Sequence, residues 1–309
     1  MLNLQRAKKK PALFRRLTGL TVPAFEELIE KLNCHYGAFE QKRLARPDRQ
    51  RSIGAGGTFK LALEERVFMT LFALRVYPTW ALLGFLFDLD ESNAFRDARI
   101  TRAFLSEHIP LPEQVRKQRI RSLEALLEQV PELRVLIDGT EQAIQRPKEK
   151  EQRKRSYSGK KKRCTVKTQV VQEEPMGLLV DVDPGYAGSV PDKRMFEESA
   201  VQERLPERVH VWVDKGYGGL EEVVPEGWAV EQPKKKPRGG ELSEAEKARN
   251  RAVNEVRVKV EHGILRMKQY EVLGGVYRGR LGGYGGVVEL VAGLVNLERM
   301  RSLGMEWAV

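Results

Sequence analysis

The chain has 309 residues, 41% of them hydrophobic, which is enough for about two domains with a real core. Lysine and arginine number 54 against 43 acidic residues, and this net charge of +11 favours a polyanionic partner such as nucleic acid. Cys34 and Cys164 are too few for a disulfide scaffold or a cysteine-rich zinc site. With no secretory or membrane-spanning stretch in view, we expect a soluble, cytoplasmic protein without a membrane partner.

Residues 1–131 are predicted to form a helical domain. Helices are expected after an N-cap at Thr21, over about 63–76 and over about 113–129, and the polar, basic stretch 41–60 is expected to be a mobile linker. Pro131 ends the last of these helices and marks the predicted domain boundary.

The segment 79–106 has the pattern of a helix-turn-helix. Thr79 can cap a helix over 80–87, and a three-residue turn leads to a longer helix over 91–106. The second helix carries Arg96, Arg99 and Arg102 at three-residue spacing, which predicts a basic stripe able to contact DNA. An ordinary helical hairpin with a solvated face explains the same pattern equally well.

Residues 132–309 read as strands and loops followed by a long helix. Strands are predicted over 133–138, 164–171, 176–182, 209–214 and about 228–230, and Asp192 is predicted to cap a short helix that ends near Ser199. The basic run 148–163 is expected to be a solvated loop, and Tyr157 among its cations suits contact with DNA. A second basic loop contains Lys234 and Lys235.

The long helix is expected to begin near Ser243, where Ser243 and Glu246 form a capping box, and to continue to about 270–272. Its apolar stripe comprises Val253, Val256, Val260, Ile264 and Met267. A parallel polar stripe comprises Asn254, Arg257, Glu261 and Lys268, about 100° round from the first, so a glutamate at the border of the buried face can look into the domain.

Two aspartates stand at corresponding places in this half of the chain. Asp138 and Asp214 each follow a short apolar strand and each precede a glycine-containing turn. Ligands of open α/β sheets gather at the carboxyl ends of strands, so neighbouring strands would bring the two carboxylates together. Like charges that close are tolerated when a cation is shared, and carboxylate oxygens favour Mg²⁺ or Mn²⁺. Glu261 would complete such a site.

Several motifs in order across 134–298 resemble the DDE transposases of bacterial insertion sequences, in particular the family named for insertion sequence five. The matching pieces are Asp138-Gly139-Thr140-Glu141 with Ile144 and Arg146-Pro147, Tyr157-Ser158-Gly159-Lys160-Lys161-Lys162, Thr165-Val166-Lys167-Thr168-Gln169, Asp214-Lys215-Gly216-Tyr217, Pro233-Lys234-Lys235, Val260-Glu261-His262, Tyr277-Arg278 and Leu294-Val295-Asn296-Leu297. The helical N-terminal part is similar to the helix-turn-helix region of that family.

The resemblance implies an α/β, RNase H-like mixed-sheet catalytic domain in which Asp138, Asp214 and Glu261 are the catalytic, metal-binding triad for two Mg²⁺ or Mn²⁺ ions. It implies a transposase that binds the inverted repeats of its element, hydrolyses DNA at the ends and joins the freed 3′-hydroxyl to target DNA in the bacterial nucleoid. A homodimer or a larger synaptic assembly is expected by analogy. Further expected DNA contacts are Lys160, Lys161, Lys162 and Lys215, together with Arg257 and Lys268, which match basic positions flanking the family's glutamate.

Two departures from the family pattern leave other functions open. Relatives commonly have histidine where this chain has Pro191 and Cys164. A catalytically weakened DNA-binding repressor, and an RNase H-like nuclease without strand transfer, are therefore the alternatives.

Overall fold

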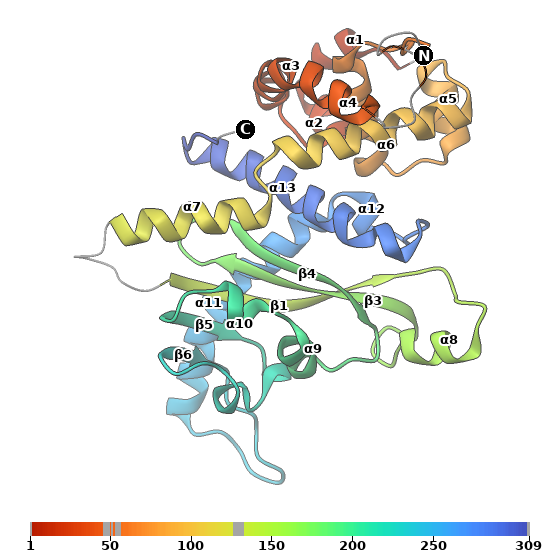
Figure 1. The fold of residues 1–309 in the computed structure, drawn as a ribbon. Helices are drawn as coiled ribbons and strands as arrows, with labels where there is room; N and C mark the ends of the chain where they lie inside the picture. The colour runs from red at the N-terminus through yellow and green to blue at the C-terminus, as the bar shows by residue number, and fades with distance from the viewer. Residues whose placement is uncertain (1, 46–49, 51, 53–56, 126–132, 308–309) are drawn as a thin grey trace. The chain divides into compact units, whose positions relative to one another are not determined.

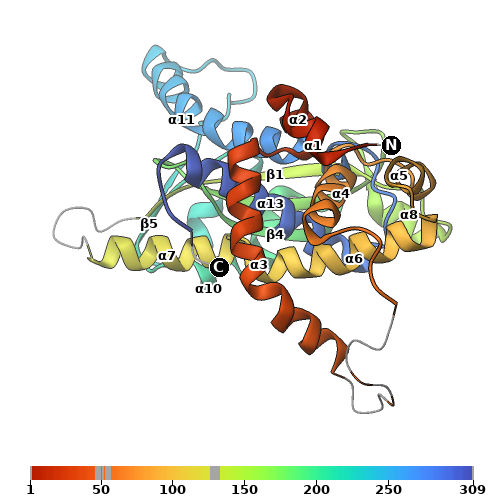
Figure 2. The ribbon, with the colours of Figure 1, turned by 90° about the horizontal axis from the view of Figure 1, so that it is seen from above.

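The computed structural model describes residues 2–45, 50, 52, 57–125 and 133–307. The chain forms two compact units, shown in Figures 1 and 2. The first comprises Met1–Pro110, Gln269–Val272 and Met300–Val309, and the second comprises Leu111–Lys268 and Leu273–Arg299. The predicted boundary at residue 131 lies outside the described residues.

The first unit is helical. Its elements are α1 (Leu4–Lys8), α2 (Pro11–Thr18), α3 (Val22–Leu44), α4 (Leu63–Arg75), α5 (Trp80–Phe87) and α6 (Glu91–His108). Thr21 caps α3 and Thr79 caps α5, each by accepting a bond from a backbone N–H three residues on, as their sequence positions predict. The helix pair of the segment 79–106 is confirmed, with Asp88 in the left-handed conformation after α5. Most of the predicted linker 41–60 lies outside the described residues, although α3 extends through its first four positions.

The second unit is built on a mixed sheet. Its strands are β1 (Leu133–Ala143), β2 (Tyr157–Ser158), β3 (Arg163–Glu173), β4 (Leu179–Ala187), β5 (Val209–Val213) and β6 (Trp228–Glu231). The order is β2-β3-β1-β5-β6, with β4 also paired to β3. The pairs β1–β3 and β3–β4 are antiparallel, whereas β1–β5 and β5–β6 are parallel.

Helices accompany the sheet. They are α7 (Pro112–Ala125), α8 (Lys150–Ser156), α9 (Asp192–Glu198), α10 (Val201–Arg204), α11 (Glu244–Lys268), α12 (Glu271–Gly274) and α13 (Tyr284–Ser302), with 3₁₀ turns η1 (Lys215–Tyr217), η2 (Leu220–Glu222) and η3 (Leu281–Gly283). The predicted capping box begins α11, because the Ser243 hydroxyl accepts from the Glu246 N–H while the Glu246 carboxylate accepts from the Ser243 N–H. No helix in the described part of the chain combines the length and hydropathy that a membrane crossing requires.

The two faces of the sheet are covered by different helices. On β3, the amide of Gln172 donates to the Lys259 carbonyl of α11, whereas the amide of Gln169 donates to the Ser199 hydroxyl just after α9. Side chains three positions apart in a strand point to opposite faces, so α11 covers one face and α9 the other. Burial on both sides explains why β3 reads as a continuous buried run after its first residue.

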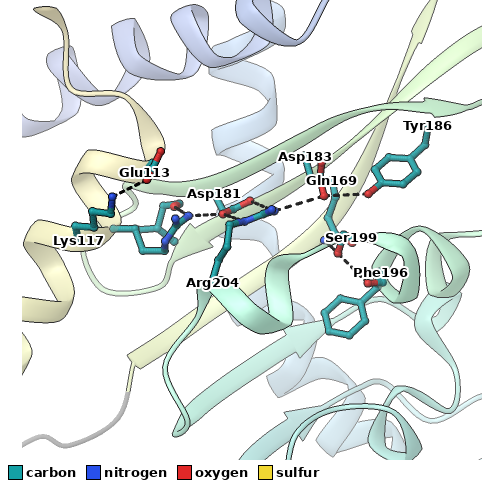
Figure 3. A network of polar contacts seen from close by, with 11 residues as sticks. Glu113, Lys117, Gln169, Asp181, Asp183, Tyr186, Phe196, Ser199 and Arg204 are labelled. Carbon is teal, nitrogen blue, oxygen red and sulfur yellow. Dashed lines mark hydrogen bonds and ion pairs between the residues drawn. The ribbon is translucent and has the colours of Figure 1, made fainter. Parts of the chain in front are cut away.

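An ion network ties β4 to α7 and α10 (Figure 3). Asp181 on β4 accepts bonds from Arg116 of α7 and from the Arg204 guanidinium of α10, the latter at 2.7 and 2.8 Å. Arg204 also reaches Asp183 at 3.4 Å, and Asp183 accepts from the Tyr186 hydroxyl. The Asp181 side chain is only 4% exposed, so two guanidinium groups replace the water it loses.

Two predictions about the chain around β1 are wrong. The backbone does not turn at Gly139, because β1 continues to Ala143 through its antiparallel pairing with β3. The basic run 148–163 is solvated but is not simply a loop, since it contains α8, which buries no residue. Arginine and lysine are good helix formers, and the basic last turn of α8 complements the helix dipole.

Candidate active site

Asp138 and Asp214 stand at the same level of the sheet. The parallel pairing of β1 with β5 ends at the pair Ile137 and Val213, and each aspartate is the next residue in its chain. Beyond this level β5 stops and Asp214 leads into η1, whereas β1 continues beside β3. The expectation that the two strands are neighbours is therefore confirmed, although Asp138 lies inside its strand and not at its end.

The Asp138 side chain belongs to the face of the sheet that α11 covers. Thr140 and Gln142, two and four residues further along β1, line a small pocket with Ile264, Met267 and Lys268 of α11. Side chains at even spacing along a strand share a face, so Asp138 points to the same side. Gly139 faces the opposite side, where a Cβ would lie 2.9 Å from Met195 Cε of α9.

Burial dominates the electrostatics of Asp138. Loss of hydration raises the pKa of its carboxyl from 3.8 to about 6, while the bond from the Gly139 N–H and the charge of Arg257 act in the opposite direction. The negative charges of Asp214 and Asp192 raise the pKa further. The site therefore disfavours a second negative charge unless a cation accompanies it.

Arg257 of α11 supplies a cation to the other aspartate. One of its terminal nitrogens lies 3.2 Å from the Asp214 carboxylate, and the Arg257 side chain is only 10% exposed. Its contact with Asp214 places the Arg257 side chain at the level where the pairing of β1 with β5 ends.

Glu261 lies one helical turn after Arg257. It is exposed and forms no ion pair with another described residue. Seven residues on, the Lys268 ammonium donates to the Glu141 carbonyl of β1 at 3.1 Å. Along α11, Glu261 thus lies between a residue that contacts Asp214 and one that contacts β1 beyond Asp138.

A further carboxylate, which the sequence pattern assigned to a capping role, lies near both aspartates. A Cβ at Gly139 would lie 3.2 Å from Asp192 Oδ1, and one at Gly216 would lie 2.9 Å from Asp192 Oδ2. Asp192 is not the cap of α9, because Pro191 occupies that position and Asp192 Oδ1 accepts from the Lys167 ammonium at 2.9 Å. The cap prediction is wrong because a distant strand supplies a stronger partner. The sequence did hold one indication of this contact. Lys167 is a charged residue within a run that forms a buried strand, and a buried lysine needs an acidic partner.

Tyr217 in η1 lies within electrostatic range of these three aspartates. Burial, together with the negative charges of Asp138, Asp192 and Asp214, raises the pKa of its hydroxyl well above the ordinary value. The hydroxyl is buried and has no hydrogen-bond partner in the described part of the chain. In the motif Asp214-Lys215-Gly216-Tyr217, the sequence indicated a role for the aspartate and a turn at the glycine. Nothing in the local pattern indicated that the tyrosine is buried.

Lysines gather beside β1. Burial and the nearby positive charges of Lys161 and Lys160 lower the pKa of the Lys268 ammonium, against the opposing effect of Glu141 and Asp138. Lys160, Lys161 and Lys162 are all exposed, as is Tyr157 on β2. Arg257 and Lys268 therefore stand within electrostatic range of Asp138, and Lys160 and Lys161 within range of Lys268, an arrangement suited to an anionic ligand.

The other predicted DNA contacts have different surroundings. Lys215 is exposed directly after Asp214, and the Lys235 ammonium lies 2.9 Å from where a Cβ at Gly218 would be. Lys234 is already paired with Glu246 in the first turn of α11. On α6, Arg96 and Arg99 are exposed and Arg102 is half-buried.

The donors at this level of the sheet fit a hard divalent cation. Within the described ranges, no group of three or more histidine, cysteine, aspartate or glutamate side chains is arranged to hold a metal ion. Asp138 and Asp214 nevertheless offer carboxylate oxygens, the ligands that such a cation prefers, from adjoining strands. The buried Tyr217 hydroxyl, which has no hydrogen-bond partner among the described residues, is a further polar group at this level of the sheet.

Comparison with known proteins identifies the family of the chain. Residues 137–296, just over half of the chain, match the family described as DDE superfamily endonuclease. The chain is 29% identical over 300 residues to a Microchaete diplosiphon protein described as a probable transposase for insertion sequence element IS702, covering 96% of this chain and 98% of that protein. A cryo-EM structure of a piggyBac transposase synaptic complex with hairpin DNA is similar with 12% identity and a TM-score of 0.45, covering 96% of this chain and 76% of that one. The family match includes Asp138, Asp214 and Glu261.

Proposed function

The chain belongs to the DDE superfamily endonucleases, and we propose that it is the transposase of a bacterial insertion sequence, acting on DNA in the cytoplasm. The family supports phosphodiester cleavage. The full-length likeness to a probable insertion-sequence transposase supports the narrower activity, in which the protein binds the ends of its element, cleaves them and joins them to target DNA.

We propose an RNase H-like fold for the second unit. The order of three antiparallel strands followed by two parallel ones, with α11 across one face, supports this assignment. The observation that carries the functional proposal is the shared level of Asp138 and Asp214 where the parallel pairing of β1 and β5 ends.

Asp138, Asp214 and Glu261 are the proposed ligands of Mg²⁺ or Mn²⁺. Bound there, one or two such ions would activate the attacking oxygen and stabilise the leaving one. Glu261 would complete the set, because it is exposed on α11 four residues after Arg257 and forms no ion pair with a described residue. Arg257 holds Asp214 in position and offsets its charge.

The lysines beside β1 are the proposed contacts to the DNA backbone at the reaction centre. Lys160 and Lys161 lie within electrostatic range of the Lys268 ammonium, which is itself within range of Glu141 and Asp138. Tyr157, Lys162, Lys215 and Lys235 are exposed and extend this basic surface, while Lys234 would have to exchange its partner Glu246 for a phosphate. Phosphate contacts position the substrate without reading its sequence.

The test is metal-dependent cleavage of DNA that carries the inverted repeats flanking the gene. We expect cleavage with Mg²⁺ or Mn²⁺, and its loss in Asp138→Asn, Asp214→Asn and Glu261→Gln. Glu255→Gln is the matched control, because Glu255 is exposed on the same helix six residues earlier. Wild-type cleavage by Asp138→Asn would overturn the triad.

A second assay separates strand transfer from hydrolysis. A transposase joins a pre-nicked element end to plasmid DNA, whereas a nuclease that only hydrolyses leaves the plasmid unjoined. Tight DNA binding with no cleavage under any metal condition would identify a repressor instead.

A further inference from the structure

The ion pair of Lys167 and Asp192 fixes the start of α9. The Lys167 ammonium donates to Asp192 Oδ1 at 2.9 Å and to the Val190 carbonyl at 2.7 Å, so it binds the chain on both sides of Pro191. The Lys167 side chain is 9% exposed and the Asp192 side chain 35%. Because a buried ammonium needs partners of this kind, the pair determines where the Asp192 carboxylate lies.

The Asp192 carboxylate lies against two segments that each follow a proposed metal ligand. Gly139 comes directly after Asp138 in β1. Gly216 comes two residues after Asp214, in η1. A Cβ at Gly139 would lie 3.2 Å from Asp192 Oδ1, and a Cβ at Gly216 would lie 2.9 Å from Asp192 Oδ2. The two oxygens of one carboxylate therefore approach both segments, and the missing side chains make room for them.

The carboxylate approaches these segments beyond the last pair of the parallel ladder. The pairing of β1 with β5 ends at Ile137 and Val213, so both glycines lie past it. There β1 continues beside β3, whereas the chain after Asp214 enters η1. A carboxylate fixed against both backbones sets how closely they approach one another, and so sets where the two preceding aspartates lie.

We propose that Lys167 and Asp192 form a positioning pair, which keeps the two triad aspartates at the spacing that a shared divalent cation requires. Lys167 fixes the carboxylate of Asp192, and that carboxylate fixes the backbone after each triad aspartate. Replacing residues that orient metal ligands typically lowers metal affinity by about 10–100-fold. This inference deepens the function proposed above and rests on it, because the aspartates must be metal ligands for their spacing to matter.

Charge alone gives a different expectation. The negative charge of Asp192 helps to raise the pKa of Asp138, so it acts at the proposed metal site, and its loss would weaken cation binding whichever way it works. Lys167 distinguishes the two cases. Removing its positive charge would strengthen the binding of a cation if only charge mattered. If position matters, the same change releases Asp192 and weakens binding.

The experiment is Mn²⁺ binding to the full chain without DNA, followed by the electron paramagnetic resonance signal of free Mn²⁺. We expect Lys167→Met and Asp192→Asn each to weaken binding by roughly tenfold. The double variant Lys167→Met/Asp192→Asn should lose no more than either single variant, because the two residues act as one unit. Asp192→Glu keeps the charge but moves the carboxylate by one methylene, so it should also weaken binding.

Arg194 and Glu198 provide the matched control. They form an ion pair on the same helix at 2.7 Å, and their side chains are 67% and 43% exposed. Arg194→Met and Glu198→Gln should bind Mn²⁺ as the wild type does. Thermal unfolding in chelator shows which variants are folded at the assay temperature. Asp192→Glu, at a partly exposed side chain, carries the test if Lys167→Met does not fold.

Unchanged or tighter binding of Mn²⁺ by Lys167→Met, or unchanged binding by Asp192→Glu, would overturn the positioning role. Asp138→Asn separates this failure from a failure of the proposed function. If Asp138→Asn weakens binding and the variants of the pair do not, the positioning role alone is wrong. If the wild type binds no Mn²⁺, or Asp138→Asn binds it equally well, the triad is wrong and the positioning role with it.

Discussion

The guanidinium of Arg257 lies 3.2 Å from the carboxylate of Asp214, so α11 provides positive charge where β1 and β5 bring two aspartates to one level. At Asp138 the positive charge of Arg257 does not offset the effect of burial. Arg257 lowers the pKa of Asp138 only in part, and burial keeps it at about 6. Burial therefore governs the protonation of Asp138, which has measurable consequences.

The first prediction concerns Asp138 and pH in chelator-treated protein. Its carboxyl has a pKa near 3.8 when hydrated and about 6 in the folded chain, so the folded state binds this proton more tightly. As pH rises from about 4 to about 6, the carboxyl makes folding less favourable by up to roughly 3 kcal/mol. Asp138→Asn is therefore expected to be more stable than the wild type at pH 8, but not at pH 4, in urea unfolding.

Glu246 provides a control of opposite sign. The bonds from Lys234 and from the Ser243 N–H lower the pKa of its carboxyl to about 2. The ionised Glu246 carboxylate stabilises the folded chain at pH values above its ordinary pKa of 4.5, and this contribution is lost as the pH falls towards 2. Glu246→Gln should therefore destabilise the chain at pH 8. Equal stability of Asp138→Asn and wild type at pH 8 would contradict the burial argument.

The second prediction concerns Gly139 and Gly216, the two glycines that Asp192 approaches closely. An alanine Cβ at Gly139 would lie 2.9 Å from Met195 Cε and 3.2 Å from Asp192 Oδ1, and one at Gly216 would lie 2.9 Å from Asp192 Oδ2. Both neighbours are ends of side chains, but Met195 is fully buried and Lys167 holds Asp192, so we expect the added methyl group to cost about 1–3 kcal/mol. Gly139→Ala and Gly216→Ala should each show a lower melting temperature and slower DNA cleavage.

Gly286→Ala is the matched control. Its Cβ would meet nothing within 4 Å, and it lies in α13, where alanine is favoured over glycine by up to about 1 kcal/mol. Its melting temperature should stay the same or rise. If Gly139→Ala behaves in the same way, the close approach of α9 to β1 is not a real constraint.

The third prediction concerns the network on β4 (Figure 3). Asp181→Ala removes the carboxylate shared by Arg116 and Arg204 and leaves the buried Arg116 charge without its counter-ion, with the Val180 carbonyl still accepting from it. We expect a loss of about 3–5 kcal/mol in the free energy of unfolding. The exposed pair of Glu113 and Lys117 is the comparison, since their side chains are 64% and 62% exposed, and Glu113→Gln should cost less than about 1 kcal/mol. Similar costs for the two substitutions would show that burial does not govern this network.

The fourth prediction concerns the lysines beside β1. If Lys160 and Lys161 contact DNA phosphates, then Lys160→Gln and Lys161→Gln should each lower the slope of log affinity against log salt concentration by about 0.9 for duplex DNA. Fluorescence anisotropy at several salt concentrations measures this slope. Lys117→Gln, which removes an exposed lysine paired with Glu113, should leave the slope unchanged. A slope that does not change in the Lys160 and Lys161 variants would remove these residues from the DNA surface.

Several local features of the fold, namely helix caps and one strand, could be predicted from the sequence. The N-caps at Thr21 and Thr79 and the capping box of Ser243 involve residues three apart, so the sequence alone specifies them. The apolar run 209–213 ends in an aspartate and forms β5 as predicted. That both Asp138 and Asp214 follow buried strands was visible for the same reason.

The sequence by itself determined which residues carry charge, where helices begin and which runs are buried, because these depend on neighbours within a few positions. Only the tertiary structure decided that β1 continues past Gly139, because that depends on pairing with β3. It also decided that Asp192 approaches Gly139 and Gly216 and that Arg257 meets Asp214. These contacts join residues tens of positions apart, and their partners are selected by the register of strands and the packing of helices, which no local pattern encodes.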